Sequence, residues 1–263
     1  MIRLITSLLL SVIFLTSCDK IRKSLGTSGR GGSIADQIRI SSQSKPEIVT
    51  AFKAISAATH EHNRVFLQSI DDNNHSNELA YSAGLTHLDN SARNCAGLAK
   101  QIINAVAVTR VYEKGLFVPF DKMRQQIKGM PTWTKDQALM RRGYIEIIDQ
   151  GIATYDSAIS YLERGEEPLL RRNFDKQAVP RDVTDEFLRL RRLGTKEITE
   201  CNLRMFREQR ASLQCYRDAM TSVNQAIANQ HVSKAGLHEQ NAKQFENRMI
   251  AELRKQHSAG SLL

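Results

Sequence analysis

The chain has 263 residues, of which 41% are hydrophobic and 25% are charged, and its net charge is +9 from 37 basic and 28 acidic residues. This balance excludes a wholly disordered chain, and five prolines and fourteen glycines exclude collagen-like and proline-rich classes. Aromatic residues make up only 6%, which is thin for an all-β sandwich and usual for a helical bundle.

Residues 1–17 have the pattern of a signal peptide. Arg3 is followed by thirteen mostly apolar residues, Leu4–Thr16. That run is short for a transmembrane helix, which needs about 20 residues, and it is typical of a secretory signal. It ends in Leu15-Thr16-Ser17-Cys18, an apolar residue, two small residues and a cysteine. The alternatives are a plain cleaved signal with a chance cysteine and an uncleaved anchor.

This ending resembles the lipobox of bacterial lipoproteins, and the resemblance covers only these eighteen residues. It implies that Cys18 is lipidated, that the chain is cleaved before it, and that the protein lies in the bacterial cell envelope facing the periplasm. Two or three acyl chains anchor far better than one, because each buried CH₂ adds about 0.8 kcal/mol. Asp19 resembles an inner-membrane retention signal, so the inner membrane is slightly favoured over the outer.

Residues 18–33 are predicted to be the lipid anchor and a flexible tether. Residues 26–32 include four glycines, and the segment shows no periodic pattern of hydrophobic residues. The tether also carries four basic residues, Lys20, Arg22, Lys23 and Arg30. Contact with anionic lipid headgroups and a fully solvated linker are equal alternatives for this segment.

Residues 34–257 are predicted to form one domain of long helices. A first helix is expected from Pro46 to the polar run at residues 71–74, and a second from about Asn77 to Lys114. Gly115 and Pro119 are expected to end the second helix, and a short amphipathic piece should continue to about Ile127.

The third helix is expected to begin in a capping box at Thr134 and to end at Gly165 and Pro168. Its apolar stripe advances by three or four residues at every step: Ile145, Ile148, Ile152, Tyr155, Ile159 and Leu162. An aspartate in place of Ile152 should therefore be severely destabilising. A loop of about fifteen residues is expected to follow.

A fourth helix is expected from Pro180 to about Ile227, with Gly194 as a bending point, and a further helix from Val232 to about Gln256. Residues 258–263 are predicted to be a frayed tail. These stripes favour an all-α fold, an antiparallel bundle of about four long helices with an extra C-terminal helix. An intermolecular coiled coil is the alternative.

No motif for catalysis, metal binding or cofactor binding is found, and none of these functions is expected. His60 and His62 are two residues apart and point to different sides of a helix, and His62 is interpreted as a packed core residue. His231 and His238 share a helix face, but no third ligand stands nearby.

Between Arg171 and Arg217 there are twelve basic and seven acidic residues. Glu200 and Glu208 each lie four residues from Arg204. This spacing favours a solvent-exposed helix face on which these residues form ion pairs. An anionic envelope partner such as a lipid headgroup, a glycan or an acidic protein is the less favoured alternative. Nucleic acid is not expected as a partner, because the signal sequence implies export.

Three cysteines, Cys95, Cys201 and Cys215, remain once Cys18 is assigned to lipid. Fourteen residues of continuous helix would separate Cys201 from Cys215 by about 21 Å, further than a disulfide allows. In an up-down-up-down bundle Cys95 and Cys201 should lie at similar heights, so a Cys95–Cys201 bridge is favoured in an oxidising compartment. The equal alternative is that all three are small buried residues.

These patterns favour a lipid-anchored envelope lipoprotein whose helical domain binds or scaffolds an envelope protein, without catalysis. One alternative is an immunity protein that neutralises a toxin acting in the periplasm. Another is a carrier or sensor with an apolar cavity inside the bundle. A hydrolase acting on the cell wall would need a motif that the sequence lacks.

Overall fold

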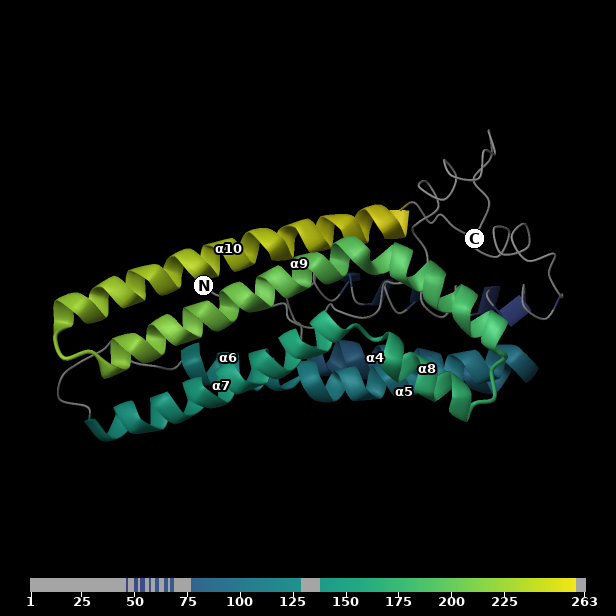
Figure 1. The fold of residues 1–263 in the computed structure, drawn as a ribbon, viewed down its shortest axis with the longest axis horizontal. Coiled ribbons are helices and arrows are strands. Elements are labelled where there is room, and N and C mark those ends of the chain that lie inside the picture. The colour runs from purple at the N-terminus through teal and green to yellow at the C-terminus, as the bar shows by residue number, and fades with distance from the viewer. Residues whose placement is uncertain are drawn as a thin grey trace. The chain divides into compact units, whose positions relative to one another are not determined.

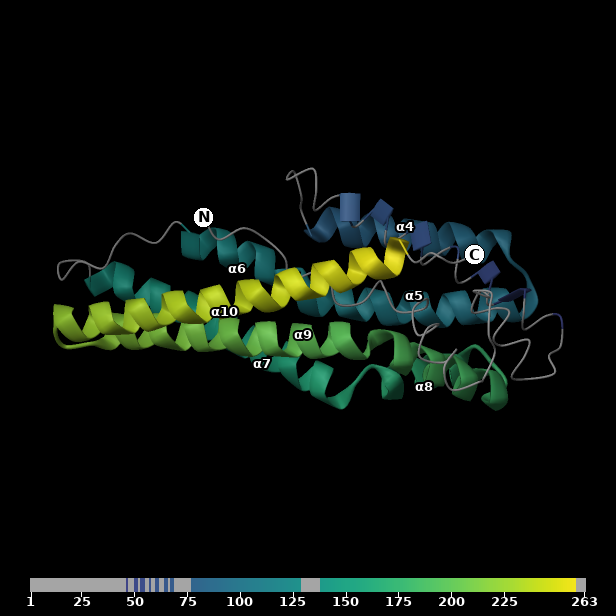
Figure 2. The ribbon, with the colours of Figure 1, turned by 90° about the horizontal axis from the view of Figure 1, so that it is seen from above.

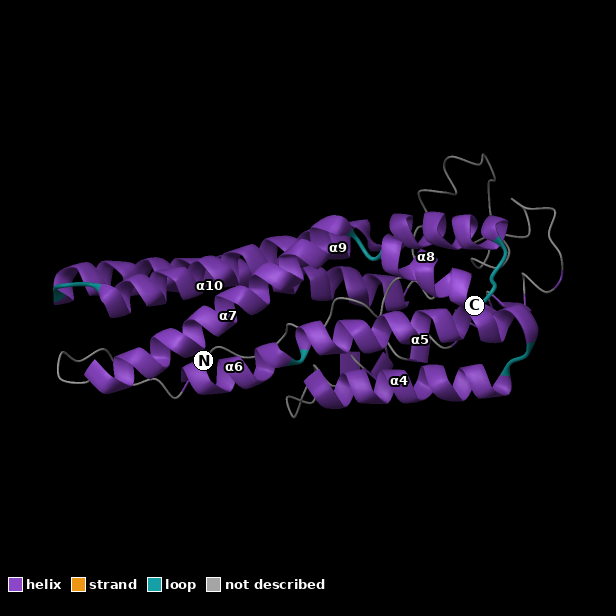
Figure 3. Ribbon diagram, turned by 60° about the horizontal axis from the view of Figure 1, so that its bottom comes forward, coloured by secondary structure: helices purple, strands orange, loops and turns teal. Residues whose placement is uncertain are grey.

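The computed structural model describes residues 77–128 and 138–258, together with scattered positions between residues 46 and 68 that are all helical. Every element in these ranges is a helix, and they contain no strand, so the all-α prediction is confirmed (Figure 3). The predicted signal, residues 1–17, and the predicted anchor and tether, residues 18–33, lie outside the described residues. Among the described helices, none has both the length and the apolar character that a bilayer crossing requires.

The chain divides into two compact units. Unit 1 contains Gly115–Gly165 and Thr199–Ile250, and unit 2 contains, among its described residues, 77–114, Glu166–Ile198 and 251–258. The long helix α9, Arg181–Thr221, continues through Gly194 and contributes its first part to unit 2 and its second part to unit 1. The outer limits of the predicted helical domain, residues 34 and 257, stay predictions.

Unit 2 contains a helical hairpin in the place of the expected single helix from Asn77 to Lys114. Helices α4, Asn77–Asn94, and α5, Gly97–Phe117, lie side by side, and Lys114 Nζ donates a hydrogen bond of 2.8 Å to Ser82 Oγ (Figure 2). Gly97 allows the reversal because its φ of 55° is a left-handed conformation that glycine adopts without steric cost. Gly115, expected to end the helix, lies inside α5.

A second correction in unit 2 concerns the expected loop after Pro168, most of which is helix α8, Glu167–Lys176. Pro168 starts this helix rather than only closing the one before it, because a proline in the first turn leaves no backbone N–H unpaired. The helix buries Leu170 and Phe174 in a core shared with α4, α5 and α9, whose other members include Leu88, Ile102, Ile103, Val106, Val183, Phe187 and Leu188.

Helix α8 ends in a complete Schellman motif with an unusual residue at its left-handed position. The N–H of Val179 donates to the Phe174 carbonyl at 3.0 Å, and the N–H of Ala178 donates to the Asp175 carbonyl at 3.1 Å. Ala178 has a φ of 54°, a conformation usually taken by glycine. Val179 and Phe174 are both buried, which supplies the apolar contact that accompanies this motif.

We expect Ala178→Gly to stabilise the protein by about 0.5–1 kcal/mol. The left-handed conformation costs an L-residue about 1–2 kcal/mol, and this exceeds the roughly 0.5–1 kcal/mol of extra chain entropy that a glycine loses on folding. The midpoint of urea denaturation measures the gain. Gly165→Ala is the matched control, because Gly165 ends α7 with a φ of 74° and an added Cβ would meet nothing within 4 Å. That control should be less stable, and a loss of stability in Ala178→Gly would contradict the assignment.

Unit 1 contains α6, Pro119–Lys128, and α7, Ala138–Arg164, which ends at Gly165 as predicted. The expected short amphipathic piece is α6, whereas the expected capping box at Thr134 lies outside the described residues. Ile148, Tyr155 and Leu162 of the predicted stripe are buried, but Ile152 is only half-buried. The most severe effect of an aspartate on this helix is therefore expected at Ile148 rather than at Ile152.

The second part of α9 pairs with α10, Gln225–Ser258, and here the predicted boundaries are wrong (Figure 1). Helix α9 ends at Thr221 rather than near Ile227, and α10 begins seven residues before the expected Val232. Asn224 starts α10 by accepting the Ile227 N–H on its Oδ1 at 2.9 Å, the hydrogen bond of an N-cap. Both helices bury a residue at every seventh position along this pair: Met205, Ser212 and Ala219 on α9, and Ala228, Ala235 and Ala242 on α10.

A cluster of aromatic rings forms the centre of unit 1. The Phe206 ring of α9 lies 5.1 Å from the Phe120 ring, 5.6 Å from Tyr155 and 5.8 Å from Phe117, measured between centroids. Phe117 also packs edge-on against Tyr161 at 6.3 Å. Because these residues come from four stretches of the chain, the cluster ties the helices of unit 1 together.

Candidate functional site

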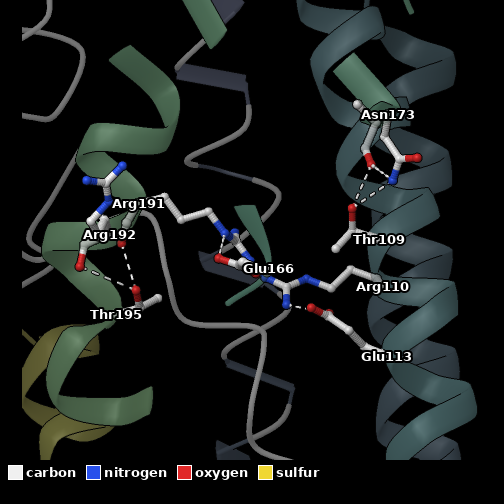
Figure 4. A network of polar contacts seen from close by, with 9 residues as sticks. Thr109, Arg110, Glu113, Glu166, Asn173, Arg191, Arg192 and Thr195 are labelled. Carbon is white, nitrogen blue, oxygen red and sulfur yellow. Dashed lines mark hydrogen bonds and ion pairs between the residues drawn. The ribbon is translucent and has the colours of Figure 1, made fainter. Parts of the chain in front are cut away.

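The most unusual feature of unit 2 is a group of charged side chains inside its core (Figure 4). Arg191 of α9 is 2% exposed, Arg110 of α5 is 4% exposed, and Glu113 of α5 is 0% exposed. Charged residues are almost never fully buried unless they are paired. Together with Glu166, which precedes α8, these residues form what we term the buried charge network.

Arg191 binds Glu166 through two parallel hydrogen bonds. Its Nε donates to Oε1 and its Nη2 donates to Oε2, so the guanidinium and the carboxylate form a bidentate, fork-to-fork pair. Glu166 stands at the N-cap position of α8, yet its side chain makes no capping hydrogen bond, because the carboxylate faces Arg191 instead. At 16%, the side chain of Glu166 is the most exposed of the network.

Arg110 and Glu113 supply the second ion pair, with 2.9 Å between Nη1 and Oε2. Burial lowers the pKa of Arg110 below its ordinary value, and the charge of Arg191 adds to this effect. The carboxylates of Glu113 and Glu166 oppose it and raise that pKa. The four side chains thus share one electrostatic environment, in which two positive and two negative charges balance.

Neutral side chains extend the network between helices. Asn173 of α8 donates from Nδ2 to Thr109 Oγ1 of α5 at 2.9 Å, and Thr109 donates to the Ala105 carbonyl at 3.2 Å. Thr195 donates to the carbonyl of Arg191 at 2.9 Å. These bonds satisfy buried polar groups and join α8 to α5 within unit 2.

The chemistry of the network is that of anion binding. A guanidinium group presents its N–H donors in a fixed fork that matches a carboxylate or a phosphate. Arginine keeps its proton in proteins and does not act as a general base, so Arg110 and Arg191 are suited to hold a negative charge. The Arg191–Glu166 pair joins α9 to the start of α8, and the Asn173–Thr109 hydrogen bond joins α8 to α5.

Glu166 and Glu167 are adjacent acids at a predicted helix end, and their sequence context predicts that both are solvated. This prediction is wrong for Glu166, because its carboxylate binds the buried Arg191. The sequence also contains a signal for the rest of the network. Thr109 and Glu113 continue the apolar stripe of α5 beyond Val106 by steps of three and four residues. Arg191 follows the buried Phe187 by four residues in the same way. A charged residue at a position where the period predicts an apolar one indicates either a helix end or a buried ion pair.

The structure describes three of the four cysteines, and none of the three forms a disulfide in it. Cys18 lies outside the described residues, and Cys95, Cys201 and Cys215 carry thiols in the structure. Cys201 and Cys215 lie on one continuous helix, α9, as predicted, and this separates them by more than a disulfide allows. Cys95 belongs to unit 2 and Cys201 to unit 1, so the Cys95–Cys201 disulfide stays a prediction.

Two of the histidines singled out in the sequence, His231 and His238, face carboxylates. His238 of α10 lies 2.8 Å from Glu208 Oε2, and His231 lies 4.0 Å from Asp218 Oδ2, both across the α9–α10 pair. The predicted core position of His62 lies outside the described residues. Within the described part of the chain, no group of three or more histidine, cysteine, aspartate or glutamate residues is placed to hold a metal ion.

The basic stretch from Arg171 to Arg217 pairs extensively with other segments of the chain. The predicted Glu200–Arg204 pair is present at 2.6 Å, but Glu208 binds His238 and Asn241. Three arginines of α9 instead bind acidic residues of the antiparallel α7, in the pairs Arg207–Glu163, Arg210–Asp156 and Arg217–Asp149, at 2.6–2.7 Å. Much of the excess positive charge is therefore used between helices rather than offered to a partner.

The fold and the site together define an all-helical protein with a charge-balanced network inside one of its two units. Comparison of the chain with protein-family models, with curated proteins and with solved structures finds no match.

Proposed function

We propose that this protein is a lipid-anchored lipoprotein of the bacterial envelope, held at the membrane by acyl chains on Cys18 and facing the periplasm. The observation that carries the proposal is the thirteen-residue apolar run that ends in Leu15-Thr16-Ser17-Cys18. A run of this length with one basic residue before it and a small residue before the cysteine suits export and processing. Asp19 favours the inner membrane slightly over the outer.

The helical units are proposed to bind or scaffold an envelope protein without catalysis. The support comes from the ion pairs that connect neighbouring helices, such as Arg210–Asp156 in unit 1 and Arg191–Glu166 in unit 2. These pairs hold helices in a defined packing, which a binding surface needs. The buried arginines are suited to hold charge and not to transfer protons.

The anchor proposal predicts that palmitate labels the wild-type protein and that Cys18→Ala abolishes the label. The thiol of Cys18 is the attachment point, so the variant should also leave the membrane fraction. Labelling in growing cells, followed by separation of membrane and soluble fractions, measures both effects.

The matched control for this experiment is Cys95→Ala, which removes a different thiol and should keep the label and the membrane location. Equal labelling of wild type and Cys18→Ala, or a soluble wild-type protein, would contradict the anchor. Crosslinking in intact cells and purification from the envelope then tests the binding role. Recovery of one specific envelope protein supports it, and recovery of none contradicts it.

A further inference from the structure

In the buried charge network, Glu166 is held as a bound ligand would be. Both of its oxygens accept hydrogen bonds from Arg191, and the charge of Arg110 acts on the same carboxylate. In Figure 4 the guanidinium group of Arg191 on α9 binds this carboxylate, and the guanidinium group of Arg110 on α5 binds Glu113. This arrangement of a planar fork with a second positive charge is typical of carboxylate recognition.

The charges of the network require one anion at this place. Arg191, Arg110 and Glu113 sum to +1, so the carboxylate of Glu166 makes the buried group neutral. An uncompensated charge inside a protein is costly, and a site of this kind therefore favours a monoanion.

Glu166 also differs from the other charged members in its place along the chain. Arg110, Glu113 and Arg191 lie inside long helices, whereas Glu166 lies at the start of α8. Gly165 precedes it with a φ of 74°, a left-handed conformation that glycine adopts without steric cost. Glu166 is thus the charged member that can leave with the smallest change in the helices.

We propose that Arg191 and Arg110 form a binding site for a carboxylate group, and that Glu166 occupies it as an internal ligand. An external monocarboxylate competes with Glu166 for the guanidinium group of Arg191, with the charge of Arg110, which pairs with Glu113, as a second attraction. The site goes beyond the proposed anchoring and scaffolding function and does not depend on it.

The test is chemical rescue of Glu166→Ala in the full chain. The variant lacks the internal carboxylate, and its melting temperature is expected to fall by roughly 10 °C. Sodium formate at about 100 mM should restore at least half of this loss, because a ligand that binds the folded state stabilises it. Sodium chloride at the same ionic strength should not, and the wild type should respond equally to both salts.

Two further variants make the result specific. Glu166→Gln keeps the side-chain volume without the charge, so formate should raise its melting temperature less than that of Glu166→Ala. Glu167→Ala removes the neighbouring carboxylate, which pairs with Arg171 and Arg192 at the surface, and it should respond equally to formate and chloride. If Glu166→Ala is unfolded by itself, it is titrated with formate and with chloride, and circular dichroism monitors whether it folds. Formate should induce folding and chloride should not. Two results would overturn the proposal. Either formate raises the melting temperature of Glu166→Ala no more than chloride does, or formate raises the melting temperature of Glu167→Ala as much as that of Glu166→Ala.

Discussion

Arg191→Ala is expected to lower the free energy of unfolding by about 3–5 kcal/mol, the cost of breaking a buried ion pair by removing one partner. The substitution leaves the carboxylates of Glu166 and Glu113 inside unit 2 with Arg110 as the remaining positive charge of the network. It also leaves a cavity where the guanidinium was packed. Urea denaturation followed by circular dichroism measures the loss.

The double variant Arg191→Met with Glu166→Gln removes both charges and keeps similar volumes, and most of the lost stability should return. Arg207→Ala is the matched control on the same helix, since its ion pair with Glu163 is exposed and contributes at most about 1 kcal/mol. A loss in Arg191→Ala that is no larger than the loss in Arg207→Ala would mean that the network does not stabilise unit 2.

In unit 1 the largest expected effect is that of Phe206→Ala, which should cost about 3–5 kcal/mol. Phe206 is fully buried, and its ring lies between those of Phe117, Phe120 and Tyr155. Removing the ring loses its burial, leaves a cavity and ends three aromatic contacts together. The same denaturation experiment measures the loss.

Phe206→Leu keeps most of the volume and should cost less than the alanine variant by at least about 1 kcal/mol. Leu237→Ala is the surface control, because Leu237 lies exposed on α10 and its truncation should change stability by at most about 0.5 kcal/mol. If Phe206→Ala costs no more than Leu237→Ala, the aromatic cluster does not form the core of unit 1.

Helix α7 shows how far the amino-acid sequence determines this fold. Its apolar stripe repeats every three or four residues, and Gly165 ends it in the left-handed conformation that glycine favours. Both signals lie within one short stretch of chain, so they can be interpreted without knowing what packs against the helix. The all-α class follows from the same local periodicity in the other segments.

The helix boundaries at residues 95–97 and 222–224 were harder to predict. The stripes of α4 and α5 continue across Gly97, because both legs of a hairpin bury their apolar faces in the same core. Periodicity alone then cannot tell a long helix from two legs that fold back. At α8, Pro168 was interpreted as an end, although the buried Leu170 and Phe174 make it a beginning.

The buried charge network depends on contacts that no local pattern contains. Arg110, Glu166 and Arg191 come from three separate segments. Each is a charged residue of a type that is usually exposed to solvent. By itself, the sequence determined the helical class and the pattern that ends at Cys18. Only the tertiary structure decided which charges are buried and which partners neutralise them, because the cost of burying a charge depends on the helices that surround it.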